Sequence, residues 1–141
     1  MNKVLFSNSK DDWETPQRLF DELNKEWDFT VDVASSDENF KVKKHYTIKE
    51  NELEQDWTME RVWCNPPYGR EIEKWVKKAS ESDAITVMLL PARTDTKWFH
   101  NYIYKKDNTT IRFLKGRLKF GNAKNSAPFP SMIVIFYPFL K

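Results

Sequence analysis

Val62-Trp63-Cys64-Asn65-Pro66-Pro67-Tyr68-Gly69 is the stretch around which the rest of this 141-residue sequence is organised. The short apolar run 62–64 suits a buried strand, and the two prolines end it, because neither can donate a hydrogen bond to a neighbouring strand. Pro66 also keeps Asn65 out of the helical region of backbone conformation. The pattern predicts an amide side chain and an aromatic ring held on a stiff turn at the end of a strand.

That turn suits a planar ligand with an exocyclic amine. The Asn65 side-chain oxygen and the Pro66 carbonyl can accept the two amine hydrogens, while Tyr68 stacks on the ring. The alternative interpretation is a proline turn that closes a strand, with the tyrosine filling the core. The turn alone leaves both interpretations open, because short motifs recur by chance.

The composition predicts one folded domain, residues 1–141, without a separate target-recognition domain. Charged residues make up 31% and aromatic residues 15%, as in folded rather than disordered chains. No apolar run approaches the roughly 20 residues that span a membrane, and the first residues lack a signal-peptide pattern. The single cysteine cannot form an internal disulfide, which favours a reducing cytoplasm.

Positive charge is concentrated near the C-terminus, although the net charge is only +2. Residues 105–124 hold seven lysines and arginines and one aspartate, and seven minus one gives a local charge of +6. Such a segment favours a surface that faces phosphates, and a solvated basic face is the alternative.

Helices and strands alternate along most of the sequence. Thr15 as N-cap and Pro16 as first helical residue predict a helix that continues through Leu23. Residues 27–34 alternate apolar with polar side chains and predict a strand that ends in a small, polar segment, 32–39, suited to a binding loop. The remaining expectations are an arm or edge strand at 1–10, a short strand at 46–48, helices at 71–80 and 94–104, and strands at 62–64, 84–90, 111–114 and 132–136.

This order predicts an α/β fold with a mostly parallel central sheet and helices on both faces. The last strand follows its predecessor without a helix and is expected to run antiparallel. Ligands of such doubly wound sheets bind beyond the carboxyl ends of the strands, which is where Asp32 and Asn65 fall.

Seven short motifs extend over nearly all of the sequence in order: Trp13-x-Thr15-Pro16, Asp32-Val33-Ala34-Ser35 with Asn39, Asp56-Trp57, Asn65-Pro66-Pro67-Tyr68-Gly69, Leu90-Pro91-Ala92-Arg93-Thr94-Asp95-Thr96 with Trp98-Phe99, Gly116-Arg117-Leu118-Lys119-Phe120, and Ala127-Pro128-Phe129-Pro130-Ser131. Together they resemble the small phage-type, Dam-like DNA N6-adenine methyltransferases. The resemblance implies a compact Rossmann-like class I methyltransferase fold, S-adenosylmethionine as methyl donor and double-stranded DNA as partner. It also implies a phage or prophage protein in the cytoplasm of a bacterial host, and we expect a monomer or weak homodimer.

The resemblance implies contacts to the cofactor from Trp13, Thr15, Pro16, Asp32, Ala34, Ser35, Asn39, Asp56 and Trp57. The Thr15 hydroxyl and the helix start would hold the carboxylate of the methionine moiety, and Asp32 would receive its ammonium group. Capping alone by Thr15, and a core position for Trp57, remain alternatives. The loop after Asp32 departs from the general methyltransferase pattern, because Ala34, Ser35 and Ser36 stand where glycines are usual.

The implied catalytic residues are Asn65, Pro66, Pro67 and Tyr68. Adenine would be flipped out of the duplex, and its N6 would attack the methyl group directly, oriented by Asn65 and Pro66 and stacked on Tyr68. Pro67 would fix the turn. Cys64 is expected to be a small buried residue rather than a nucleophile. His45 and His100 lack metal-ligand spacing, so no metal is expected.

The implied DNA contacts are Arg93, Thr94, Lys115, Arg117, Lys119, Phe120 and Ser131. The arginines would contact either a guanine edge or phosphate. Phe120 and Phe129 would be wedges beside the flipped base, or else core residues that anchor a loop. Three other functions stay open: an RNA adenine methyltransferase, a catalytically silent nucleic-acid-binding protein, and an amino-methyltransferase acting on protein glutamine.

Overall fold

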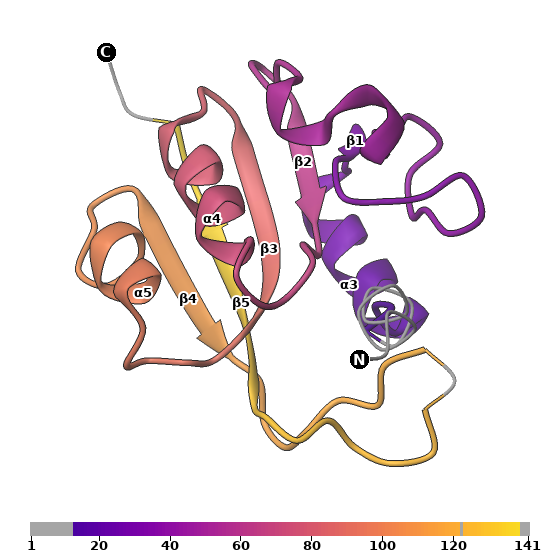
Figure 1. Cartoon of the computed structure of the whole chain (residues 1–141), viewed down its shortest axis with the longest axis vertical. Coiled ribbons are helices and arrows are strands. Elements are labelled where there is room, and N and C mark those ends of the chain that lie inside the picture. Colours follow the sequence, from indigo (N-terminus) through magenta and orange to yellow (C-terminus); the bar gives the residue numbers. More distant parts are fainter. Residues whose placement is uncertain (1–12, 122, 139–141) are drawn as a thin grey trace.

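A five-stranded sheet with helices on both faces forms the described part of the chain, residues 13–121 and 123–138, in the computed structural model (Figure 1). The predicted arm at 1–10 lies outside these residues. The strands β1 (Val31–Asp32), β2 (Arg61–Cys64), β3 (Ile85–Pro91), β4 (Thr109–Phe113) and β5 (Ser131–Phe136) lie in the order β1-β2-β3-β5-β4. The architecture is therefore mixed α/β, as predicted.

The direction of the last strand, β5, makes this a mixed sheet. β1, β2 and β3 pair in parallel, whereas β5 runs antiparallel to both β3 and β4. β5 is thus antiparallel as expected. Because it lies between β3 and β4 instead of at an edge, half of the strand pairings are antiparallel, and the sheet is less parallel than the sequence predicted.

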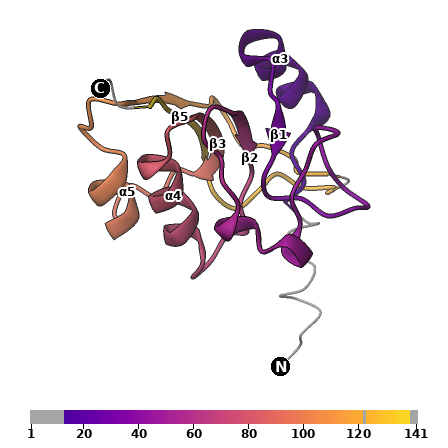
Figure 2. The ribbon, with the colours of Figure 1, turned by 90° about the horizontal axis from the view of Figure 1, so that it is seen from above.

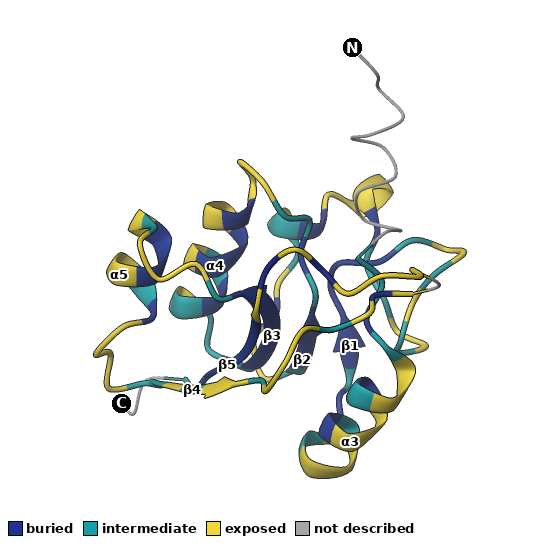
Figure 3. Cartoon of the chain, turned by 90° about the horizontal axis from the view of Figure 1, so that it is seen from below, coloured by how far each residue is buried: buried dark blue, intermediate teal, exposed yellow. Residues whose placement is uncertain are grey.

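Within the described residues, three α-helices cover the sheet: α3 (Gln17–Trp27) on one face, and α4 (Ile72–Glu81) and α5 (Lys97–Tyr102) on the other (Figure 2). Successive strand residues alternate between the two cores. On β2, Val62 and Cys64 pack with α4 and α5, while Trp63 packs with α3. Both faces of the central strands are consequently buried (Figure 3), which explains their nearly continuous apolar runs.

The amphipathic pattern of α4 is confirmed. Ile72, Trp75, Val76 and Ala79 are its buried residues, at the spacing that places them on one side of a helix. Helix α5 begins at Lys97, later than predicted, because the Thr96 hydroxyl accepts a hydrogen bond from the Phe99 amide and acts as its N-cap.

The strand predicted at 27–34 is wrong over most of its length. Trp27 is the last residue of α3, and Asp28 closes that helix in the left-handed conformation with φ = +50°. The Asn24 side chain then accepts the Phe29 amide, so only Val31 and Asp32 join the sheet. This helix end is a local capping arrangement that the alternating apolar pattern concealed.

Two other local predictions are also wrong. Pro16, not Thr15, occupies the N-cap position of α3, and no side chain caps that helix. The strand expected at 46–48 is replaced by a 3₁₀ helix, η1 (Ile48–Glu50), which Thr47 and Glu50 initiate as a capping box. A second 3₁₀ helix, η2 (Glu52–Glu54), follows it.

The connection between β4 and β5, residues 114–130, is called the β4–β5 arm below. It extends past the ends of the two strands (lower part of Figure 1) and reaches the segment before α3, where the Gly121 amide donates to the Glu14 carbonyl at 2.8 Å. A cross-arm bond from the Ala127 amide to the Leu118 carbonyl, also 2.8 Å, holds its two limbs together. Among the described residues, no helix is both long and apolar enough to cross a membrane.

Candidate active site

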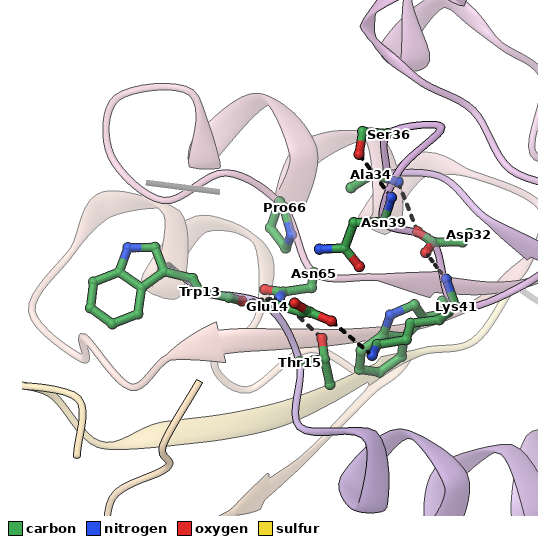
Figure 4. Close-up of a pocket in the computed structure, with 11 residues that line it drawn as sticks. Trp13, Glu14, Thr15, Asp32, Ala34, Ser36, Asn39, Lys41, Asn65 and Pro66 are labelled. Atoms are coloured by element: carbon green, nitrogen blue, oxygen red, sulfur yellow. Dashed lines mark hydrogen bonds and ion pairs between the residues drawn. The ribbon is translucent and has the colours of Figure 1, made fainter. Parts of the chain in front are cut away.

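The carboxyl ends of β1 and β2 adjoin a pocket, as the topology predicted. Asp32 is the last residue of β1, Asn65 follows the last residue of β2, and Trp13, Glu14 and Thr15 lie beside Asn65 (Figure 4). The pocket is lined by Trp13, Glu14, Thr15, Asp32, Ala34, Ser36, Asn39, Lys41, Trp63, Asn65 and Pro66. Residues far apart in the sequence therefore meet where the motifs indicated a site.

The Asn65 amide is held in one orientation. Its Nδ2 donates to the Trp13 carbonyl at 2.6 Å and to the Thr15 Oγ1 at 3.0 Å. A backbone carbonyl can only accept, so the nitrogen end of the amide must face it. The other end, Oδ1, is buried and accepts no hydrogen bond from the described residues. Asn65 thus contributes an oriented, unpartnered acceptor to the site.

Asp32 fixes the loop that follows it, residues 33–41, called the β1 loop below. One carboxylate oxygen accepts the Ala34 amide at 3.2 Å, and the other accepts the Lys41 amide at 2.9 Å. No residue of this described loop has a positive φ. The loop therefore folds without the left-handed conformations that favour glycine, which explains how Ala34 and its neighbours can replace glycines here.

Four lining residues escaped the sequence-based prediction of the site: Glu14, Ser36, Lys41 and Trp63. The Lys41 side chain is 9% exposed, and its Nζ lies 2.8 Å from the Gln17 Oε1 and 3.6 Å from a Glu14 carboxylate oxygen. Glu14 belongs to the same wall of the pocket. In the sequence, Lys41 is one of several lysines before Tyr46, and only the hydrogen bond from its backbone to Asp32 separates it from the others. No sequence signal distinguished it.

Several predicted cofactor contacts do not line this pocket. Trp57 is 1% exposed in the core, with its ring centroid 6.3 Å from that of Trp75, so the core interpretation of Trp57 holds. Asp56 is exposed and accepts the Thr58 amide, which together with the Thr58 side chain lowers the pKa of the Asp56 carboxyl. Ser35 is buried and bonds the Tyr46 carbonyl, and Pro16 precedes α3.

An aromatic cluster lies behind the Asn65–Tyr68 turn. The Tyr68 ring centroid is 6.2 Å from that of Trp13, 5.7 Å from Phe129 and 6.4 Å from Phe120. The Tyr68 hydroxyl donates to the Leu89 carbonyl at 3.0 Å, and burial raises its pKa well above the usual value. Tyr68 is consequently a protonated, fixed ring rather than a base.

A second hollow, of about 270 Å³, lies on the other side of the turn. It is lined by Tyr68, Gly69, Ile72, Pro91, Arg93, Thr96 and Trp98. Arg93 is exposed, and its guanidinium lies 5.6 Å from the centre of the Phe129 ring. The turn therefore separates two cavities, with Asn65 and Pro66 facing the first and Tyr68 and Gly69 facing the second.

The predicted DNA contacts divide into exposed and buried residues. Arg93, Thr94, Lys115, Arg117 and Lys119 are exposed. Phe120 and Ser131 are each 1% exposed, so neither side chain is accessible to DNA in this structure, and their DNA contacts stay a prediction. Phe120 and Phe129 belong to the core beside α3, as the anchoring interpretation held. Cys64 is buried, as expected, and the described residues contain no group of three or more acidic, cysteine or histidine side chains that could hold a metal ion.

Comparison with known proteins gives two matches. A model of the family described as DNA N-6-adenine-methyltransferase (Dam) matches residues 3–141. A DNA N-6-adenine-methyltransferase of Escherichia phage T1 is 34% identical over 95 residues, which are 64% of this chain and 40% of that protein. The match therefore spans less than half the length of the phage relative.

Proposed function

The chain belongs to the DNA N-6-adenine-methyltransferase (Dam) family, and from this premise we propose that it transfers a methyl group from S-adenosylmethionine to N6 of a flipped adenine in double-stranded DNA. The observation that carries the proposal is the Asn65 amide, whose buried oxygen has no partner among the described residues and borders the pocket beyond β1 and β2. A site for an exocyclic amine requires such an acceptor.

The groups that line the first pocket match the charges of the amino-acid end of S-adenosylmethionine. That end carries one ammonium and one carboxylate group, and the pocket wall offers an acidic Asp32 and a basic Lys41. We assign the ammonium to Asp32, and the carboxylate to Lys41 and the Thr15 hydroxyl, as charge-assisted hydrogen bonds. Ala34 and Asn39 complete this wall, and the Trp13 ring packs away from it, against Tyr68, Phe120 and Phe129. The cofactor supplies an electrophilic methyl group on a sulfonium.

Asn65 and Pro66 would prepare the amine for attack. In adenine the N6 lone pair is delocalised into the ring, so N6 is a weak nucleophile. Acceptance of its two hydrogens by the Asn65 oxygen and the Pro66 carbonyl favours a pyramidal amine with its lone pair directed at the methyl group. These bonds strengthen as positive charge develops on nitrogen, which is the condition for lowering the barrier. In this step a bond from N6 to the methyl carbon would form as the bond from that carbon to the sulfonium sulfur breaks, which leaves the cofactor as a neutral thioether, and one N6 proton would pass to water.

Pro67 and Tyr68 would place the base. Pro67 stiffens the turn, and Tyr68 presents the part of its ring that remains accessible to the second hollow, which we assign to the flipped adenine. The hydrogen bond from Tyr68 to Leu89 fixes the ring plane before the base arrives. Because the Tyr68 hydroxyl stays protonated, it takes no part in proton transfer.

DNA would be held by the exposed cations around this hollow. Arg93 and Thr94 lie at the end of β3, and Lys115, Arg117 and Lys119 project from the β4–β5 arm. Their charge supports phosphate contacts, which position the duplex without reading its sequence. The sheet, with β5 antiparallel between β3 and β4, supports a compact Rossmann-like class I methyltransferase fold. We place the protein in the cytoplasm of a bacterial host, encoded by a phage or prophage.

Product analysis tests this function. The purified chain is incubated with S-adenosylmethionine labelled in the methyl group and with duplex DNA, duplex RNA or an unrelated protein, and the digested products are analysed by mass spectrometry. We expect label in N6-methyladenine from DNA alone. Label only in RNA or in glutamine would replace the proposed substrate, and DNA binding without any methyl transfer would refute the enzymatic function.

A further inference from the structure

We propose that Thr15 is a positioning residue, whose hydroxyl, together with the Trp13 carbonyl, keeps the Asn65 amide oxygen turned toward the substrate. This inference rests on the proposed function, because that oxygen is the one assigned to the adenine amine. It adds a second role to Thr15, distinct from any contact with the cofactor carboxylate.

An asparagine can present either end of its amide. The nitrogen and oxygen ends have nearly the same shape, so steric fit does not choose between them, and only hydrogen bonding does. If the Asn65 amide turned over, its oxygen would face the Trp13 carbonyl oxygen at the 2.6 Å now spanned by a hydrogen bond. Two acceptors would then confront each other, and the substrate amine would meet an NH₂ donor instead of an acceptor.

The Thr15 hydroxyl takes the second hydrogen of the same amide. Its Oγ1 lies 3.0 Å from Nδ2, and Thr15 is 3% exposed, so water does not compete for this bond. With both hydrogens of the amide engaged, rotation about the bond to the amide group is restrained at two points. Thr15 precedes Pro16, the N-cap residue of α3, and its hydroxyl does not cap that helix. The hydroxyl is instead engaged with Asn65.

The Trp13 carbonyl is itself held by packing. The Trp13 ring lies 5.0 Å from Phe129 and 5.2 Å from Phe120, both on the β4–β5 arm, and the next carbonyl, of Glu14, accepts the Gly121 amide. The arm thus fixes the segment 13–15 from behind. Phe120 and Phe129, which are both buried, thus act on the Asn65 amide indirectly, by holding the segment 13–15.

The test compares Thr15→Val, which keeps the shape and removes the hydroxyl, with Thr15→Ser, which restores it. Methylation is measured in single turnovers at saturating S-adenosylmethionine and DNA, so that weaker cofactor binding does not enter the rate. We expect the valine variant to be roughly tenfold slower, because one hydrogen bond is lost, and the serine variant to recover most of that loss. Thr110→Val, on an exposed position of β4, is the matched control.

Two further measurements separate positioning from binding and from folding. In the Asn65→Ala background, Thr15→Val should cause no additional slowing. In protein labelled with ¹⁵N-asparagine, the Asn65 side-chain amide signals should shift and exchange faster with water in Thr15→Val, at unchanged melting temperature. The inference is overturned if Thr15→Val has the wild-type rate at saturation. It is also overturned if Thr15→Val slows the Asn65→Ala protein by the same factor as it slows the wild type. Absence of N6-methyladenine from the wild-type reaction would instead refute the proposed function, and the inference with it.

Discussion

The β1 loop and the β4–β5 arm border the Asn65–Tyr68 turn from opposite sides and are held by different forces. Polar side chains hold the β1 loop: Asp32 accepts two of its backbone amides, and Glu52 accepts the Ser35 amide at 3.1 Å. Aromatic rings anchor the arm, and its cations point to solvent. Directional hydrogen bonds suit recognition of one small molecule, whereas an apolar anchor with charges outside suits a long polyanion.

Asn65 lies between the two regions, and its loss should have the largest effect. We expect Asn65→Ala to lower the rate of N6-methyladenine formation by about a hundredfold or more, since a preorganised partner of the reacting group is removed. Cofactor affinity, measured by calorimetry, should remain close to that of the wild type. Asn101→Ala, the same substitution on the exposed side of α5, is the control. Normal turnover in Asn65→Ala would disprove the proposed chemistry.

A substitution at the start of the β1 loop should mainly affect the affinity for the cofactor. Asp32→Asn keeps the size of the side chain but removes its charge, so the affinity for S-adenosylmethionine should fall by roughly tenfold or more, the usual weight of a charge-assisted hydrogen bond. Affinity for duplex DNA, measured without cofactor by fluorescence anisotropy, should hardly change. Asp107→Asn, at an exposed position before β4, serves as control. Unchanged calorimetric affinity in Asp32→Asn would remove this residue from the proposed site.

Substitutions in the β4–β5 arm should change how strongly DNA binding depends on the salt concentration. Arg117→Ala combined with Lys119→Ala should weaken DNA binding and reduce the slope of log affinity against log salt by about two, near one per lost phosphate contact. Titrations by anisotropy over a range of salt concentrations measure this slope, and calorimetry should show intact cofactor binding. Lys105→Ala with Lys106→Ala, which lie before β4 and outside the arm, removes equal charge as a control. Equal slopes for the two double variants would contradict a specific role for the arm.

The smallest expected effect is a pH dependence of the stability of the fold, caused by a histidine next to the β1 loop. His45 follows the loop, stacks on Phe40 with ring centroids 4.0 Å apart, and contacts Asp37 at 3.1 Å and the Lys43 carbonyl at 2.7 Å. Burial lowers the pKa of His45, but the Lys43 carbonyl and Asp37 outweigh it and raise the pKa above the ordinary 6.5. The charged form is therefore favoured by folding.

A histidine whose pKa is raised by folding stabilises the fold most at pH values below its ordinary pKa. This stability is lost as the pH rises through the folded-state pKa. The melting temperature of the wild type should accordingly have a component that falls as the pH rises above 6.5. His45→Gln should lack that component, whereas His100→Gln, on α5, should retain it. Identical pH profiles for His45→Gln and wild type would exclude this contribution.

Prediction from the sequence was most accurate in segments where one hydrophobic period or one motif dominates. Strand β3, helix α4 and the turn after β2 follow from apolar spacing and from prolines, whose effects are local. The helix end at Asp28 was missed because Trp27 and Phe29 fit a strand pattern as well as a capped helix. Trp57 and Phe120 were placed in functional surfaces although they are core residues, because a motif shows that a residue matters but not which way it points.

Residues that act through contacts distant in the sequence were beyond prediction. Thr15 lies 50 positions from Asn65; local rules favoured it as the N-cap of α3, whereas Pro16 occupies that position and the Thr15 hydroxyl bonds Asn65. Lys41 enters the pocket because Asp32 binds its backbone amide, and no pattern of charges along the chain reveals that bond. The family resemblance, in contrast, was read from the motifs and is confirmed over residues 3–141.

Under the proposed function, the double engagement of the Asn65 amide would also determine which bases the site can tolerate. Since both of its hydrogens are already donated, to Trp13 and to Thr15, the remaining end of the amide, its oxygen, can only receive a hydrogen. An adenine offers an amine there and is matched. Hypoxanthine, the deaminated form of adenine, has the same outline but carries a carbonyl oxygen at that position, which would oppose the amide oxygen. If the turn binds the base as proposed, it would exclude this damaged base by the polarity of one atom.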